Sequence, residues 1–117
     1  ELARMEKTCA AILAFARNHP DRAPQLRRFR EYYLPTTRKL LDTALGLGSA
    51  EVTNAQTIRR DITGILHTLN QAYDTLYDTL LQDVSLDVST EIDTLEAMLR
   101  QDGLTHDFAA DFGSAKG

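Results

Sequence analysis

The feature of this sequence that most restricts its fold is the recurrence of apolar residues three or four positions apart. Residues at that spacing share one face of an α-helix, whereas a half-buried strand alternates apolar and polar residues. No stretch of the chain shows such alternation over the length of a strand. The spacing therefore predicts an all-α protein whose helices each bury one apolar stripe.

The first two helical segments are marked by proline and glycine. Residues 2–16 carry the first apolar stripe, which ends at "NHPDRAP" because each proline disfavours the helical state of the residue before it. The second stripe covers residues 26–47, where Gly46 and Gly48 suit the left-handed conformation of a helix C-cap.

The third segment is the longest, about residues 51–83, and a fourth begins near Asp87 or Ser89 and stops at Gly103. Within the third, Gly64 is expected to allow close approach of a neighbouring helix. We predict an antiparallel bundle of three main helices with a shorter fourth, forming one domain over residues 1–104.

A flexible tail is predicted over residues 105–117, which are rich in small residues and end in glycine. Phe108 and Phe112 are the tail residues that are expected to dock on the bundle.

Pro35 lies inside the second segment, yet the apolar stripe keeps its helical phase from residue 26 to 47. This favours one continuous helix that is bent at Pro35, where the ring removes the hydrogen bond to the Glu31 carbonyl. The hydroxyl of Thr36 or Thr37 can compensate by bonding a carbonyl of the preceding turn. The alternative is that Pro35 lies in the first turn of a new helix, where proline is tolerated.

Charge is unevenly distributed, although the net charge is only −4. Six basic residues lie between residues 22 and 39, whereas residues 71–112 are strongly acidic. Two solvated helix faces of opposite sign explain this pattern, and so does a surface for a charged partner. The acidic balance argues against a nucleic-acid partner, and we expect either Tyr32 or Tyr33 to face the core instead of both stacking on bases.

Cys9 is the single cysteine, which excludes an internal disulfide and a cysteine-based metal site. It lies on the first apolar stripe, where a thiol behaves as a small hydrophobe. No apolar run approaches the roughly 20 residues of a membrane span, and no signal-peptide pattern is present. We expect a cytoplasmic protein, with membrane association only through segments that these 117 residues do not include.

His67, Asp74 and Asp78 are weak candidates for a metal site, because with Gln71 they form a polar line on one face of the third segment. The solvated back of an amphipathic helix gives the same pattern, and we favour that interpretation. The chain has no Glu-x-x-His pair of a di-metal bundle and no phosphate-binding Gly-Lys-Ser/Thr motif. We therefore expect no catalytic residues and no cofactor.

Two stretches resemble a known family: "YYLPTTRKLL" (32–41) and "DVSTEIDTLEAMLRQDGL" (87–104). They are similar to the 5-bromo-4-chloroindolyl phosphate hydrolysis protein family, also called XpaC-like, over roughly residues 20–104. The resemblance implies a bacterial helical protein of a kind often described alongside toxic-anion (tellurite) resistance proteins of the TelA type. The family motif would be carried by Tyr32, Tyr33, Leu34, Pro35, Thr36, Thr37, Lys39, Leu40 and Leu41.

The helical periodicity, together with this resemblance, favours a non-enzymatic interaction domain that pairs with another helical protein, such as a TelA-like one, in toxic-anion resistance or envelope stress. The candidate surfaces are the basic stretch 22–39 and the acidic faces of the third and fourth segments. The alternative, which the family name suggests, is a phosphoric-ester hydrolase acting on 5-bromo-4-chloroindolyl phosphate. The resemblance supplies no catalytic residues for that reaction.

Overall fold

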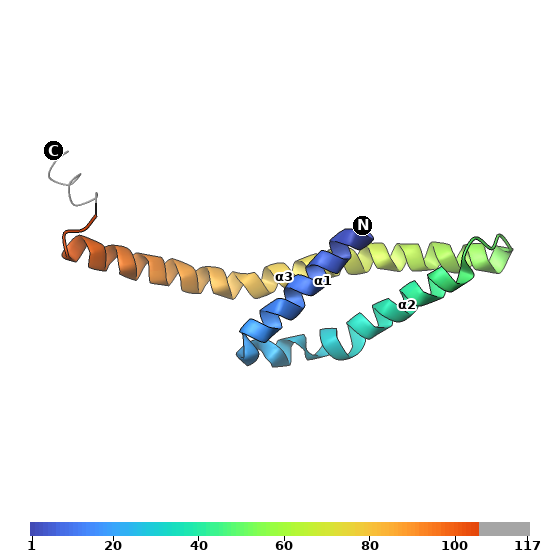
Figure 1. Ribbon diagram of the computed structural model, residues 1–117, viewed down its shortest axis with the longest axis horizontal. Helices are drawn as coiled ribbons and strands as arrows, with labels where there is room; N and C mark the ends of the chain where they lie inside the picture. Colours follow the sequence, from blue (N-terminus) through green and yellow to red (C-terminus); the bar gives the residue numbers. More distant parts are fainter. Residues whose placement is uncertain (106–117) are drawn as a thin grey trace. The chain divides into compact units, whose positions relative to one another are not determined.

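The computed structural model describes residues 1–105, and every regular element in that range is helical. The prediction of an all-α protein is confirmed for these residues, and the elements are α1 (Leu2–Asn18), the 3-10 helix η1 (Pro20–Leu26), the π-helix η2 (Phe29–Tyr33), α2 (Leu34–Leu47) and α3 (Thr53–Gln101) (Figure 1). The predicted tail, with Phe108 and Phe112, lies outside the described residues except for Thr105. Contacts within the chain divide it into two compact units, residues 1–78 and the part from Thr79 onward.

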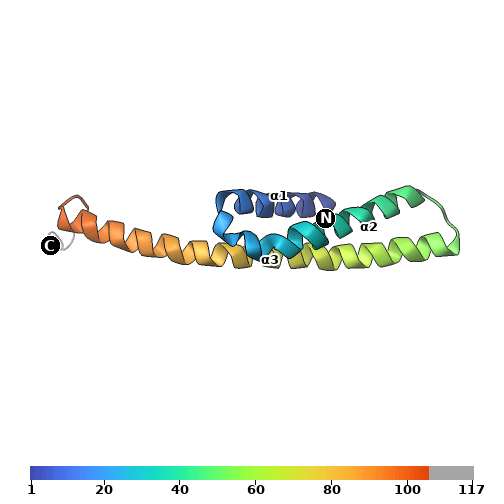
Figure 2. The ribbon, with the colours of Figure 1, turned by 90° about the horizontal axis from the view of Figure 1, so that it is seen from below.

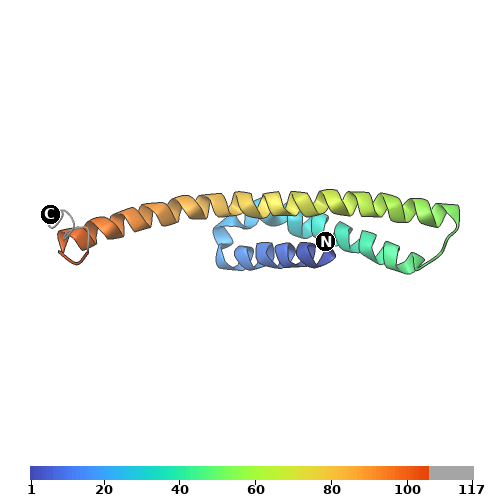
Figure 3. The same cartoon turned by 90° about the horizontal axis from the view of Figure 1, so that it is seen from above.

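In the first unit, α1 lies beside α3, as Figures 2 and 3 show from opposite sides. Its buried face follows the predicted spacing and consists of Met5, Cys9, Ile12 and Phe15. Leu2 was expected on this face, but it is 54% exposed. The stripe therefore begins one turn later than the sequence predicts.

The end of α1 at Asn18 agrees with the predicted break before Pro20. The backbone N–H of His19 donates to the Phe15 carbonyl, and the two rings stack at 4.1 Å between centroids. The residues after this break were expected to be a simple turn, but they form η1. Leu26, at the end of η1, is fully buried.

Near Pro35 the backbone stays helical, because the residues that flank η2, Arg28 and Leu34, both have right-handed helical dihedral angles. The Leu34 N–H donates to the carbonyl of Phe29, five residues back, which is the hydrogen bond of a π-turn. The Thr37 hydroxyl donates to the Tyr33 carbonyl at 2.7 Å, which confirms the predicted compensation by a threonine. The bend at Pro35 and the three-helix arrangement remain predictions.

The π-turn also explains why one prediction about the tyrosines is wrong. A π-turn contains one residue more than an α-turn, so the apolar stripe changes phase before Pro35. Tyr32 and Tyr33 are 60% and 39% exposed, so neither occupies the core position that the spacing assigned to one of them.

Helix α2 ends at Leu47, and its C-cap Gly48 has a positive φ of +56°, as expected of a glycine there. Its ψ of −129° is not that of the predicted left-handed helical conformation, however, and Gly46 lies inside α2. Arg59 closes the connection from α2 to α3, since its guanidinium donates to the carbonyls of Ala50 at 2.6 Å and Gly48 at 3.4 Å. A Cβ at Gly64 would meet nothing within 4 Å, so the predicted close helix approach at Gly64 is wrong.

The boundary that was predicted between a third and a fourth helix is wrong, because α3 continues through residues 84–87 to Gln101. Asp87 and Ser89 resemble helix caps, but the stretch contains neither glycine nor proline. Serine and aspartate cost only a few tenths of a kcal/mol inside a helix, so they do not end one. The Thr90 hydroxyl, for example, donates to the Leu86 carbonyl of its own helix at 3.1 Å.

The second unit contains the C-terminal part of α3, which stops where predicted. Gly103 has a φ of +72°, and the Leu104 N–H donates to the Leu99 carbonyl at 2.8 Å, as in a Schellman cap. Within residues 1–105, no helix is both long and apolar enough to cross a membrane.

Candidate functional site

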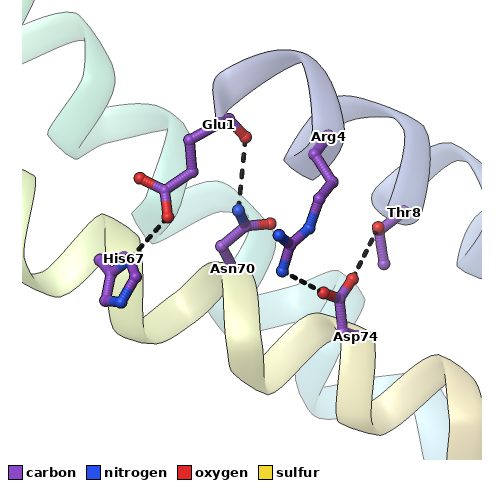
Figure 4. A network of polar contacts seen from close by, with 6 residues as sticks. All are labelled: Glu1, Arg4, Thr8, His67, Asn70 and Asp74. Carbon is purple, nitrogen blue, oxygen red and sulfur yellow. Dashed lines mark hydrogen bonds and ion pairs between the residues drawn. The ribbon is translucent and has the colours of Figure 1, made fainter.

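A network of polar side chains joins the start of the chain to the middle of α3 within the first unit (Figure 4). It includes two of the three weak metal candidates, His67 and Asp74, and its members are Glu1, Arg4, Thr8, His67, Asn70 and Asp74. At His67 and Asp74, the polar line on α3 is thus not a purely solvated face. It is a contact with the N-terminal turns of α1.

Asp74 is held by two residues of α1. The Arg4 guanidinium forms an ion pair with one carboxylate oxygen, and the Thr8 hydroxyl donates to the other at 3.0 Å. Both interactions favour the charged form, so the Thr8 bond, and then the Arg4 bond, lower the pKa of Asp74.

His67 and Asn70 hold Glu1. The His67 Nδ1 lies 2.7 Å from the Glu1 carboxylate, and this bond is the main reason why the pKa of Glu1 is lowered. The Asn70 amide donates to the Glu1 carbonyl at 3.4 Å. Asn70 is fully buried, and its Oδ1 lacks a hydrogen-bond partner within the part of the chain that the structure describes.

The geometry gives the metal hypothesis no support. Over residues 1–105, no three His, Cys, Asp or Glu side chains converge in a way that could hold an ion. His67 and Asp74 bond different residues of the α1 segment, and Asp78 is exposed one turn further along. The sequence could show that these groups share a face, but not that α1 supplies their partners.

A second, buried network lies beside Pro35. The hydroxyl groups of Thr37 and Tyr73 are 2.6 Å apart, and the Tyr73 hydroxyl also donates to the Tyr33 carbonyl at 3.2 Å. Thr37 and Tyr73 are each only 3% exposed, and burial raises the pKa of Tyr73. The Phe29 ring meets the Tyr73 ring edge-on at 5.2 Å. This network fixes the start of α2 to α3.

The motif residues have different environments. Thr37 is buried, whereas Pro35 and Lys39 are exposed, and the other aliphatic and threonine positions are half-buried: Leu34, Thr36, Leu40 and Leu41. The Tyr32 and Tyr33 rings meet edge-on at the surface with 5.5 Å between centroids, and the Arg28 guanidinium lies 5.8 Å from the Tyr33 ring centroid. None of these contacts pairs a nucleophile with a general base.

A groove of about 950 Å³ lies between α1 and α2, and we call it the α1–α2 groove. Its lining is largely apolar and includes Leu2, Met5, Cys9, Leu34, Leu41 and Leu45. The buried Cys9 thiol has a raised pKa because of desolvation, so it is a poor nucleophile. The arrangement is suited to bind apolar surface. Sequence reasoning missed the groove because spacing does not show which stripes the packing leaves uncovered.

The second unit carries an apolar row on α3, which we call the α3 row: Val84, Val88, Ile92, Leu95 and Leu99. At 100° per residue these five side chains fall within about 80° of the helix circumference. Three of them are strongly exposed: Val88 at 44%, Ile92 at 50% and Leu95 at 56%. An apolar stripe of this kind is expected on a helix that packs against another surface.

Comparison of the chain with models of protein families, with curated proteins and with solved structures gave no match.

Proposed function

We propose that this protein is a non-enzymatic helical interaction domain that binds another helical protein. In line with the XpaC-like resemblance of the sequence, the proposed partner is a TelA-type protein, and the proposed setting is toxic-anion (tellurite) resistance or envelope stress in a bacterial cytoplasm. The observation that carries the proposal is the exposed α3 row, with Val88, Ile92 and Leu95 each about half exposed. Contiguous exposed apolar side chains on a helix mark surfaces for a partner helix.

The polar contacts support this choice over the phosphoric-ester hydrolase. A hydrolase of this size needs a base or a metal ligand that is free to act. His67 and Asp74 are instead bonded to Glu1 and Arg4, and Cys9 is buried with a raised pKa. Turnover of the indolyl phosphate with added metal, lost in both His67→Ala and Asp74→Ala, would replace our proposal with the hydrolase.

We infer further that the first unit is an antiparallel three-helix bundle whose middle helix bends at Pro35. Two adjacent residues of α3 support the bundle, because Asp74 bonds α1 while Tyr73 bonds the start of α2. The π-turn beside Pro35 supports the bend, since proline and π-turns are both common causes of helix kinks. Residual dipolar couplings should then give different axes for residues 27–33 and 36–47.

A direct binding experiment tests the proposed function. Purified TelA-type protein should bind the chain in isothermal titration calorimetry, and Ile92→Asp should weaken binding by placing a charge in the apolar contact. The matched control is Ala97→Asp, which adds the same charge on the opposite side of the same helix. Equal binding by both variants, or no binding by the unmodified chain, would refute the proposed partner.

A further inference from the structure

The chain carries two apolar surfaces that nothing covers within the described residues: the α1–α2 groove in the first unit and the α3 row in the second. We propose that they bind each other between two copies of the chain, so that the α3 row of one copy lies in the α1–α2 groove of the other. This inference rests on the proposed function, which is the binding of a helical partner, and it names a helix of a second copy of the chain as one such partner.

The lengths of the two surfaces are comparable. The α2 residues that line the groove run from Leu34 to Leu45, which is about 18 Å at the rise of an α-helix. The α3 row extends from residue 84 to residue 99, which is about 24 Å at the same rise. A narrow apolar stripe of this length is the usual ligand of a hydrophobic groove between helices.

Charge favours the groove over pairing of one α3 row with another. Residues 79–102 carry six carboxylates, at Asp83, Asp87, Glu91, Asp93, Glu96 and Asp102, against the one cation of Arg100. The helices α1 and α2 carry five cations, at Arg4, Lys7, Arg17, Arg38 and Lys39, against the carboxylates of Glu6 and Asp42. Two α3 rows packed together would oppose like charges, whereas α1 and α2 together carry three more cations than carboxylates, with Glu6 and Arg38 lining the groove itself.

The apolar content of the groove is suited to the row. Leu45 is 79% exposed and Leu2 is 54% exposed, so covering the groove removes two large side chains from water. Since each chain has one groove and one row, a two-fold dimer forms this contact twice.

Sedimentation velocity of two variants and their mixture tests the inference. Leu45→Asp blocks the groove and Ile92→Asp blocks the row; both sites are exposed in the single chain, so its folding is retained. The unmodified chain should be a dimer, and each variant should raise the dimer dissociation constant by on the order of a hundredfold. An equimolar mixture should dimerise more tightly than either variant alone, because it contains one intact groove and one intact row.

Two matched controls carry the same charge outside the proposed contact. Thr43→Asp lies on the side of α2 opposite the groove residue Leu45, and Ala97→Asp lies opposite the α3 row. Both should dimerise as the unmodified chain does. An unmodified chain that stays monomeric at a concentration of roughly 100 µM would overturn the inference.

Cysteine cross-linking identifies the surfaces that meet. Cys9 is buried, so it is replaced by alanine, and Leu45→Cys in the groove with Ile92→Cys in the row then gives a two-cysteine chain whose added thiols are at exposed positions. Oxidation with copper phenanthroline should give intermolecular disulfides between positions 45 and 92, seen by mass spectrometry of the linked peptides, and Ala97→Cys in place of Ile92→Cys should not. Disulfides between two copies of position 92 would show that the α3 rows pair with each other and would overturn the inference.

The outcomes also separate this inference from the proposed function. A monomeric chain that binds the TelA-type protein through Ile92 overturns the inference and leaves the proposed function in place. A dimer with the predicted cross-link that does not bind a TelA-type protein supports the inference and refutes the proposed partner.

Discussion

Replacing Thr37 with valine tests whether the buried hydroxyl next to Pro35 fixes α2 to α3. The hydroxyl donates to the Tyr33 carbonyl at 2.7 Å and is 2.6 Å from the Tyr73 hydroxyl. Valine has nearly the same shape, so the change removes hydrogen bonds without leaving a cavity. Each net hydrogen bond stabilises a fold by about 0.5–1.5 kcal/mol. Since Tyr73 can still donate to the Tyr33 carbonyl, we expect Thr37→Val to cost about 1–2 kcal/mol.

A second variant isolates the contribution of the hydrogen bond between the Thr37 and Tyr73 hydroxyl groups. Tyr73→Phe removes the other hydroxyl but leaves the bond from Thr37 to Tyr33 in place, so we expect a cost of about 1 kcal/mol. The double variant should cost less than the sum of the two, by about 0.5–1 kcal/mol, because both single variants break the same bond.

Urea unfolding followed by circular dichroism at 222 nm gives these free energies. The control is Thr43→Val, because the Thr43 hydroxyl also donates to a carbonyl four residues back, that of Lys39 at 3.0 Å, but at an exposed site. Its cost should stay within about 0.5 kcal/mol. If Thr37→Val costs no more than Thr43→Val, or if the two core variants are simply additive, the network does not join α2 to α3.

Four further outcomes are expected. Gly64→Ala should raise the free energy of unfolding by about 1 kcal/mol, because a Cβ there meets nothing within 4 Å; an unchanged or lower urea midpoint would contradict this. Leu86→Pro should lower the helical circular dichroism far more than Leu86→Ala, since the 66% exposed site lies inside α3 and not at a helix boundary. Asp74 has a lowered pKa, so its charged form stabilises the fold above its usual value of 3.8, and this stability is lost as pH falls through the lowered pKa; Asp74→Asn should therefore flatten the urea midpoints between about pH 2 and 5. Burial should make Cys9 react with dithionitrobenzoate at pH 8 at least about tenfold more slowly in the folded chain than in urea, and equal rates would place the thiol in solvent.

The ends of the helices could be predicted where the backbone itself determines them. Pro20 cannot continue α1, and Gly48 and Gly103 take positive φ angles that other residues rarely adopt. These are local properties of one or two residues, so the sequence alone is sufficient. The joining of the predicted third and fourth helices could not be found in this way. A serine or aspartate that caps one helix is chemically identical to one inside another, and only the packing decides between them.

The candidate sites show the same limit. Spacing placed His67 and Asp74 on one face of α3, and both bond the start of the chain, but their partners, Glu1 and Arg4, are more than 60 residues away in the sequence. Spacing also missed Asn70, because a polar residue among buried positions breaks the apolar pattern. The π-turn at η2 was hidden for a related reason: an extra residue in a helix leaves every residue type in its place and changes only the phase.

That extra residue has a consequence for how the chain tolerates change. Arg30 and Glu31 are both exposed within η2, so replacing either side chain touches nothing buried. Deleting either one, however, would turn the five-residue turn into a four-residue turn and rotate Phe29 by about 100° relative to α2. The Phe29 ring would then leave the edge of the Tyr73 ring. At positions 30 and 31 the number of residues therefore matters more than their identity, and homologous chains should differ there by exchange of surface side chains while keeping the same length.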